Sequence, residues 1–208
     1  MDEIKMISIN QLYPFKNHPF RVETNRELYE LMCSIEREGV LVPLLARPRS
    51  NGAGYELISG HRRAKASDLA GLTEVPVVVR EMTDDQAVIA MVDSNLQREH
   101  LLPSEKAYAY KMKLEAMNHQ GKRMEDETSV QVEPKHNNTR SNEMLAKQVG
   151  ESVAQIKRYI RLTNLIPKIM DMVDNGIIAF TPAVELSYLT EEEQYELHAV
   201  MDMEQCTP

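Results

Sequence analysis

The first hundred residues alternate between short apolar runs and amphipathic stretches, a pattern typical of a small α/β unit with interleaved strands and helices. The predicted strands are Lys5–Ile9, Leu41–Arg47, Tyr55–Ile58 and Val75–Arg80. Helices are predicted from Thr24 to Gly39, from His61 to Ala70 and from Thr83 to about Leu96. The stretch Tyr13–Val22 holds two prolines and has no helical period, so it is predicted as a loop.

Two of these helices begin with a capping box. Thr24 is followed three residues later by Glu27, and Thr83 is followed in the same way by Gln86. In such a pair each side chain can accept a hydrogen bond from an otherwise unpaired backbone N–H group of the first turn. Behind the first pair, apolar residues recur at helical spacing and define one face of the helix: Leu28, Leu31, Met32 and Ile35.

The second half of the chain is helical by pattern, with one polar interruption. Pro103 opens a helix, and the stretch His119–Arg140 that follows is rich in Lys, Asp, Glu, Asn and Thr. This composition predicts a flexible linker. After it, the stretch Ser141–Asn164 is predicted to hold two short helices. Further helices are predicted over Pro167–Asn175 and Thr181–Tyr188, followed by a last acidic helix that is capped by Thr190 with Glu193. The expected domains are therefore 1–100, a connecting helix and linker over 101–140, and an all-α domain over 141–208.

The stretch Ser141–Asn164 has the pattern of a helix-turn-helix. Ala146 permits close approach of a second helix, Gly150 lies at the turn, and Ser152 with Gln155 caps the helix that follows. A helical hairpin without a DNA partner has the same turn geometry, but the basic outer face of this one favours DNA binding. The residues expected to contact DNA are Ser152, Gln155, Lys157, Arg158 and Arg161.

A second candidate site lies where a predicted strand passes into a helix, in the run Ile58–Ala66. Gly60 permits a tight turn, and Arg62 and Arg63 stand at the helix N-terminus, whose N–H groups and dipole are already positive. Cations are normally disfavoured there, so their presence suits a bound anion, most simply a polyphosphate. An exposed basic helix start with ordinary surface ion pairs is the alternative interpretation.

Polar residues also close the predicted helix that ends near Leu96, in the run Asp93–Glu99. These residues are equally typical of a solvated helix end. Taken together with Gly60–Arg63, however, they can be interpreted as part of a phosphate-binding site. Asn95 and Arg98 supply an amide and a guanidinium suited to phosphate oxygens, and Asp93 or Glu99 could help to hold a magnesium ion.

Composition adds limits rather than a function. The net charge of −8 argues against a wholly basic nucleic-acid binder, yet five Lys or Arg and a single acid lie between Ala146 and Lys168. The 208 residues include no apolar run of membrane-spanning length and only two cysteines, Cys33 and Cys206. We therefore expect no membrane partner, no disulfide scaffold and a cytoplasmic location, nucleoid- or plasmid-associated if the DNA hypothesis holds.

In this order the motifs resemble the ParB/Spo0J/RepB-type chromosome and plasmid partition proteins, from Ile7 to about Glu196. Within this family, the sequence most resembles the members that are carried on conjugative and other mobile elements. It rests on the helix-turn-helix and on three further segments: Gly39–Leu44, Gly60–Ala66, and Asn95–Arg98 followed by Leu102–Ala107. It implies an α+β fold class, with a small ParB/sulfiredoxin-like α/β domain followed by an all-α helix-turn-helix domain.

The resemblance also implies a function. Members are DNA-binding dimers that recognise a palindromic centromere-like site, bind CTP with Mg²⁺, close as a sliding DNA clamp and work with a ParA-type ATPase. Carried over to this sequence, the triphosphate would be held by Gly60, His61, Arg62, Arg63, Asn95 and Arg98. The cytosine would lie against the Gly39–Leu44 segment, which includes Leu41 and Val42.

The sequence departs from the family pattern at positions that matter for the chemistry. His61 stands where the family has Glu, Val42 where it often has Gln, and Ser94 where it has the Glu associated with magnesium and hydrolysis. Asp93, one place earlier, would point about 100° away on a helix. The resemblance thus implies nucleotide binding, with CTP hydrolysis an open question. The family's C-terminal dimerisation domain also has no counterpart, so either the chain is truncated or the N-terminal domain dimerises alone.

Three alternatives follow from the same residues. A helix-turn-helix transcription regulator with a vestigial nucleotide pocket would need only the second domain. A nucleotide-dependent small-molecule kinase shares the N-terminal fold and would need a catalytic carboxylate, for which Asp93 and Glu99 are the nearby candidates. A sulfiredoxin also shares the N-terminal fold, but its chemistry needs the cysteine of a Gly-Cys-His-Arg motif. Here Gly60 is followed directly by His61, which argues against this activity.

Overall fold

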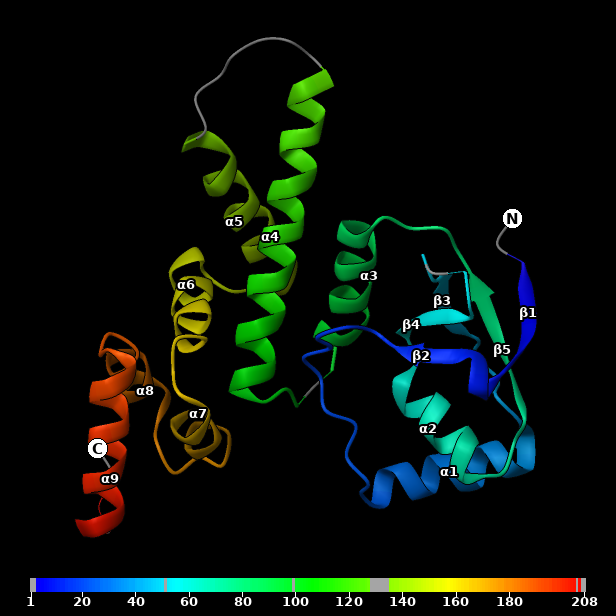
Figure 1. Cartoon of the computed structure of the whole chain (residues 1–208), viewed down its shortest axis with the longest axis horizontal. Helices are drawn as coiled ribbons and strands as arrows, with labels where there is room; N and C mark the ends of the chain where they lie inside the picture. Colours follow the sequence, from blue (N-terminus) through cyan, green and yellow to red (C-terminus); the bar gives the residue numbers. More distant parts are fainter. Residues whose placement is uncertain (1–2, 51, 99, 128–134, 205, 207–208) are drawn as a thin grey trace. The chain divides into compact units, whose positions relative to one another are not determined.

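The protein forms two compact units, residues Met1–Asn95 and Leu96–Pro208. The structure, a computed structural model, describes residues 3–50, 52–98, 100–127, 135–204 and 206, with backbone alone for 121–127 and 135–139. The first unit contains a five-stranded sheet and the second is helical (Figure 1). This bears out the predicted fold class, an α/β N-terminal domain followed by an all-α domain.

The sheet of the first unit has the strand order β1-β5-β3-β4-β2. The strands are β1 (Ile4–Ser8), β2 (Leu12–Pro14), β3 (Leu44–Pro48), β4 (Tyr55–Ser59) and β5 (Glu74–Val79). The pairs β1–β5 and β3–β4 are antiparallel, whereas β3–β5 and β2–β4 are parallel. Strand β2 overlaps the start of the stretch Tyr13–Val22, which was predicted as a loop. Pro14 is tolerated because β2 lies at the edge of the sheet.

Helices cover the two faces of this sheet in different ways. On one face an apolar core includes Leu44, Ala46 and Leu57 and packs against Ala64 of α2 (His61–Leu69). Helix α1 (Arg26–Glu38) packs on α2 through Leu28. Successive side chains of a strand point to opposite faces, so Glu56 points away from α2, toward the start of α3 (Asp84–Leu96).

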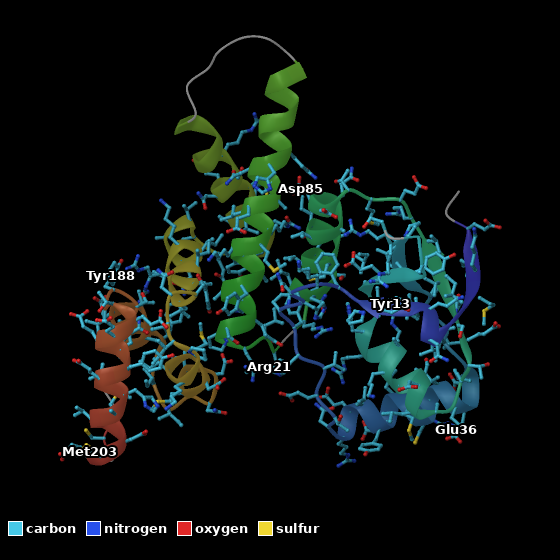
Figure 2. The ribbon with its side chains drawn as sticks, in the orientation of Figure 1. Tyr13, Arg21, Glu36, Asp85, Tyr188 and Met203 are labelled. Carbon is cyan, nitrogen blue, oxygen red and sulfur yellow. The ribbon has the colours of Figure 1, made fainter. Side chains whose placement is uncertain are left out.

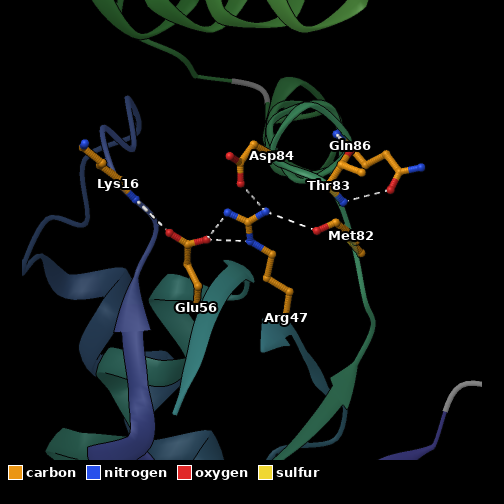
Figure 3. Close-up of polar contacts among 7 residues, drawn as sticks. All are labelled: Lys16, Arg47, Glu56, Met82, Thr83, Asp84 and Gln86. Atoms are coloured by element: carbon orange, nitrogen blue, oxygen red, sulfur yellow. Dashed lines mark hydrogen bonds and ion pairs between the residues drawn. The ribbon is translucent and has the colours of Figure 1, made fainter. Parts of the chain in front are cut away.

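Arg47 connects the second face of the sheet to α3 (Figure 3). Its guanidinium forms a 2.6 Å ion pair with Glu56 and a 2.7 Å ion pair with Asp84, and it donates to the carbonyl oxygen of Met82 at 3.3 Å. Burial by itself would lower the pKa of Arg47, but the hydrogen bonds and charges of Glu56 and Asp84 together outweigh it and raise the pKa. The side chains of Arg47 and Glu56 are 15% and 16% exposed, so this pair is largely shielded from water.

Among the boundaries that differ from the sequence prediction, two are the start of α1 and the start of β3. The N-cap of α1 is Asn25 rather than Thr24, because the Asn25 side chain accepts a hydrogen bond from the backbone N–H of Leu28. Strand β3 begins at Leu44 rather than Leu41, and the side chains of Leu41 and Val42 are 74% and 63% exposed. The carbonyl group of Val42 accepts a hydrogen bond from Arg63 instead of from a neighbouring strand.

The second unit is built from helices in chain order. They are α4 (Pro103–Glu127), α5 (Lys135–Val149), α6 (Val153–Leu162), α7 (Pro167–Asp174), α8 (Phe180–Leu186) and α9 (Glu191–Glu204). One apolar core gathers around Leu162, Ile169 and Ile178 from α6, α7 and the turn after it. A second core, which includes Tyr110, Leu145 and Ile156, joins α4 to α5 and α6. The Pro103 helix therefore packs with the helix-turn-helix.

The predicted linker over His119–Arg140 is largely helical. Helix α4 continues to Glu127 and α5 begins at Lys135, so of this stretch only residues 128–134 lie outside the described residues. Lys, Arg, Met, Gln and Glu are good helix formers, and a polar composition with these residues is compatible with an exposed helix as well as with a coil. The composition alone did not separate these two cases.

Candidate functional site: a glycine turn at a helix start and a basic helix

Gly60 forms the turn between β4 and α2, as the sequence predicted. It is the N-cap of α2 in a left-handed conformation, with φ +101°. A Cβ atom added at Gly60 would lie 3.0 Å from Leu44 Cγ and 3.3 Å from Arg63 Nη2. The absence of a side chain thus lets the first turn of α2 approach the start of β3 closely.

Arg63 reaches from α2 to the segment that precedes β3. Its Nη1 group donates a hydrogen bond to the carbonyl oxygen of Pro43 at 2.8 Å and a second one to that of Val42. Burial lowers the pKa of this guanidinium, which stays charged at neutral pH. Since a guanidinium has five N–H donors, Arg63 can hold the Val42–Pro43 backbone and still present donors to an anion.

Arg62 and His61 have different surroundings. Arg62 Nη2 lies 2.9 Å from Glu27 Oε2 of α1, an ion pair with an exposed carboxylate. The His61 ring lies against the His18 ring with 3.9 Å between centroids. Arg63, by contrast, connects the helix start with the Gly39–Leu44 segment. In that segment Gly39 is the C-cap of α1, with φ +74°.

The end of α3 is arranged as a helix terminus. The Asn95 side chain is buried and its Nδ2 group donates to the carbonyl oxygen of Met91 at 2.8 Å, and Ser94 Oγ donates to the same oxygen at 2.9 Å. Asp93 is partly buried on this helix. Glu99 lies outside the described residues, and Arg98 belongs to the second unit. Their roles in a nucleotide pocket stay predictions.

No cluster of three or more His, Cys, Asp or Glu suited to a metal ion occurs in the part of the chain that the structure describes. Asp93 is the predicted carboxylate ligand that lies among the described residues. Mg²⁺ is commonly held by one or two carboxylates together with substrate phosphates, so this donor set fits the ion only when a phosphate ligand is present. Within the described ranges no helix is long and apolar enough to cross a membrane.

Helices α5 and α6 form the two helices of the predicted helix-turn-helix. Ser152 is the N-cap of α6 and its Oγ accepts from the backbone N–H of Gln155 at 3.1 Å. Ser152 and Lys157 are exposed, and Gln155 is partly buried. Ile156 is fully buried at 0% exposure, so the opposite face of α6 is the one available to a ligand.

The two arginines of α6 are held by the region of α8. Arg158 Nη2 donates to Thr181 Oγ1 at 3.0 Å, and its guanidinium lies 5.0 Å from the Phe180 ring centroid. Arg161 is held more firmly: it donates to Ser187 Oγ at 3.3 Å and to the Ser187 carbonyl oxygen at 3.1 Å. The Tyr188 ring, labelled in Figure 2, stacks on Arg161 at 3.9 Å.

The sequence prediction missed these supporting residues. Thr181 and Ser187 lie 23 and 26 positions beyond the arginines they contact, and no local pattern signals such a pair. The contacts change the expectation for Arg161, whose guanidinium is used largely to join α6 to the end of α8. Arg158, with one side-chain acceptor, keeps more of its donors for a ligand.

Comparison with known proteins identifies both units. Residues 1–96 match the ParB N-terminal domain and residues 135–205 match the ParB HTH domain. The chain is 32% identical over 198 residues to a probable chromosome 1-partitioning protein ParB of Deinococcus radiodurans, covering 95% of this chain and 59% of that protein. It is 30% identical over 209 residues to a probable plasmid-partitioning protein ParB of the same organism, covering 93% and 67%.

A solved structure has the same fold. The C-terminally truncated chromosome-partitioning protein ParB from Caulobacter crescentus, complexed to the centromeric parS site, matches with a TM-score of 0.53 and 22% identity, covering 98% of this chain and 94% of that one. The two domain matches define a protein with a ParB N-terminal domain followed by a ParB helix-turn-helix domain. The chain belongs to the ParB family. It spans about three fifths of the length of the chromosomal relative.

Proposed function

We propose that this chain is the nucleotide- and DNA-binding portion of a ParB-type partition protein. In this proposal α5 and α6 recognise a palindromic DNA site, and the N-terminal unit binds CTP with Mg²⁺ at the Gly60 turn to form a DNA clamp. The observation that carries the proposal is the presence, in one chain and in this order, of the ParB N-terminal domain and the ParB HTH domain.

The nucleotide part rests on the Gly60 turn. Backbone N–H groups at the start of α2 and the Arg63 guanidinium offer donors to a polyphosphate, and the left-handed glycine permits close approach of the backbone. Arg63 also holds the carbonyl groups of Val42 and Pro43, whose segment would lie against the base. One side chain thus links the phosphate end of the ligand to its base end.

The DNA part rests on α6. Its buried face is fixed by Ile156, and its other face carries Lys157 and Arg158 with Ser152 at the leading end. A helix presented in this way fits the major groove, where an arginine can donate two hydrogen bonds to a guanine. A palindromic site calls for two copies of the chain, so a homodimer is part of the proposal, with a ParA-type ATPase as a further partner.

The proposal includes binding of CTP but leaves out its hydrolysis. Ser94 stands at the family's magnesium-associated position, and its hydroxyl donates to the Met91 carbonyl oxygen of its own helix. A neutral hydroxyl supplies no charge to a metal ion. CTP would therefore act as a ligand that closes the clamp.

The experiment that tests the proposal is fluorescence anisotropy with duplexes selected from a random pool, with and without CTP and Mg²⁺. We expect one palindromic sequence to bind at least tenfold more tightly than a scrambled duplex, and CTP to slow release from a closed circular duplex. Sequence-specific binding with no response to any nucleotide would contradict the clamp and favour a transcription regulator with a vestigial pocket. Turnover of a small molecule without DNA binding would favour a kinase.

A further inference from the structure

A hollow lies at the end of the sheet opposite the Gly60 turn, within the first unit. It measures about 650 Å³, a volume typical of ligand sites, and its lining includes Pro48, Tyr55 and Val79. Strand β4 begins at Tyr55 in this hollow and ends beside Gly60. A strand of this length spans roughly 16 Å, so the hollow is separate from the proposed nucleotide site.

Three cationic side chains line this hollow, one from a strand and two from the segments that follow strands. They are Lys5 of β1, Arg49 after β3 and Arg80 after β5. Two carboxylates, Glu3 and Glu81, also line it, and Glu3 is already paired with Lys5 at 3.4 Å. The lining therefore carries one net positive charge in a chain whose total charge is −8. A small anion is better suited to this balance than a cation.

Two contacts hold the Arg49 side chain in place. Its guanidinium stacks 4.0 Å from the centroid of the Tyr13 ring, and its Nη1 group donates to the Ala53 carbonyl oxygen at 3.4 Å. A guanidinium that stacks through its face keeps its edge donors for an oxyanion, which it can bind through two hydrogen bonds. Tyr13 is labelled in Figure 2 and lies on β2.

Gly54 closes the wall of the hollow next to Arg49. A Cβ atom at this position would lie 2.6 Å from the Gln11 carbonyl oxygen and 2.7 Å from Tyr13 Cε2, and the residue has φ +76°. Only glycine permits this approach without displacement of the backbone. The backbone N–H of Arg49 donates to the Gly54 carbonyl oxygen at 3.2 Å, so the turn that holds Arg49 over Tyr13 is fixed by main-chain contacts.

We infer that this hollow is an anion site for a phosphate ester, with Arg49 as the residue that binds it. Lys5 of β1 and Arg80, which follows the neighbouring strand β5, add charge, and the lining residues Tyr55, Pro48 and Val79 accept the sugar that carries the phosphate. The phosphate belongs either to the DNA backbone outside the recognised sequence or to a free nucleotide. The inference does not depend on the Gly60 site or on α6.

The test is a ¹H–¹⁵N correlation titration of the whole chain with inorganic phosphate, CTP and a duplex lacking the selected palindrome, at matched ionic strength. We expect saturable shifts in the amide signals of Arg49, Gly54 and Arg80. The shifts are lost in Arg49→Gln and weakened in Arg49→Lys, and thermal unfolding checks that both variants are folded. The control is Arg26→Gln, since Arg26 is exposed on α1, pairs with Glu30 and lies outside the hollow.

The three ligands separate the sources of the phosphate. If DNA is the source, the slope of log affinity against log salt for the non-palindromic duplex falls by about 1 in Arg49→Gln. If a nucleotide is the source, CTP saturates these signals at lower concentration than inorganic phosphate and the salt slope is unchanged. Shifts that do not saturate, or that are equal in Arg49→Gln and Arg26→Gln, overturn the inference. An Arg158→Ala protein keeps the shifts, so failure of the proposed function is seen separately.

Discussion

At the scale of single residues, the first unit depends on a glycine that lets two segments approach. Gly60 has a backbone conformation that L-residues rarely adopt, and Leu44 and Arg63 occupy the space that a side chain would need. The same close approach positions Arg63 to hold the Val42 and Pro43 carbonyl groups. Loss of the glycine therefore affects the turn, the core and the candidate pocket together.

Replacement of Gly60 by alanine tests this arrangement. Gly71 is the matched control, because it has φ +75° but no atom within 4 Å of an added Cβ. Gly71→Ala should cost about 1–2 kcal/mol for the left-handed conformation alone. Gly60→Ala should cost about 1–3 kcal/mol more, because the new methyl group contacts Leu44 and Arg63. Urea unfolding measures the free energy of unfolding of both variants. Equal decreases in the two variants would show that the close approach at Gly60 does not contribute to stability.

The arginines of α6 lead to a second prediction at this scale. Arg158→Ala should weaken specific DNA binding by about 1–3 kcal/mol with little change in stability, because in the proposed function this side chain reads a base. Arg161→Ala should lower stability as well, since Arg161 joins α6 to Ser187 and Tyr188. Anisotropy and thermal unfolding measure the two effects. An Arg158→Ala protein with unchanged DNA affinity would remove this residue from the recognition surface.

The sequence predicted the types of residue at the candidate site better than their partners. Gly60 as a turn and Ser152 as a cap follow from local rules on positive φ and on N-terminal hydrogen bonds. The bonds from Arg63 to Pro43 and from Arg158 to Thr181 cross 20 and 23 positions. Such pairs depend on the packing of whole elements, which no short pattern encodes.

At the scale of elements, helix starts are set by reciprocal side-chain bonds. At α9 the Glu193 carboxylate accepts from the Thr190 backbone N–H at 2.8 Å and from its hydroxyl at 2.9 Å, and Thr190 Oγ1 accepts in turn from the Glu193 N–H. The same box holds Thr83 and Gln86 at α3. Both boxes follow from the sequence rule.

The box at α9 leads to a pH prediction. The backbone and hydroxyl hydrogen bonds of Thr190 lower the pKa of Glu193 below its ordinary value of 4.5. The group ionises more readily when folded, so its contribution to stability is complete above the ordinary value and is lost as pH falls through the lowered pKa. Carbon-detected NMR should show that the Glu193 pKa rises part of the way toward its ordinary value in Thr190→Ala, which loses the hydroxyl, and remains lowered in Thr190→Ser, which keeps it. A Glu193 pKa that is the same in all three proteins would contradict the box.

Other elements could not be read from local patterns. The short strand β2 holds a proline and is the edge strand beside β4, so its pairing depends on the hairpin formed by β3 and β4. The start of α1 was predicted one residue early because Thr24 and Asn25 are both good caps, and the structure uses Asn25. The helix that Pro103 opens was predicted, but its continuation from His119 to Glu127 was not, because the polar composition of that stretch predicts a linker.

At the scale of the whole molecule, the proposed function assigns nucleotide binding to the first unit and DNA recognition to the second. The first unit holds the Gly60 turn and the hollow at Arg49, and the second holds the basic helix α6. The family and the order of its domains could be predicted because each domain has its own motif in its own stretch of chain. The central claim is that one ligand, CTP, is bound by the first unit through Arg63.

Calorimetric titration with CTP, ATP and GTP in Mg²⁺ tests this claim most directly, with Arg63→Ala beside the unchanged chain. Arg26→Ala is the control for loss of a surface arginine, because Arg26 lies on α1 in an exposed pair with Glu30. We predict binding of CTP in preference to ATP and GTP, at least tenfold weaker in Arg63→Ala and unchanged in Arg26→Ala. Absence of nucleotide binding, with and without the selected DNA, would contradict the account.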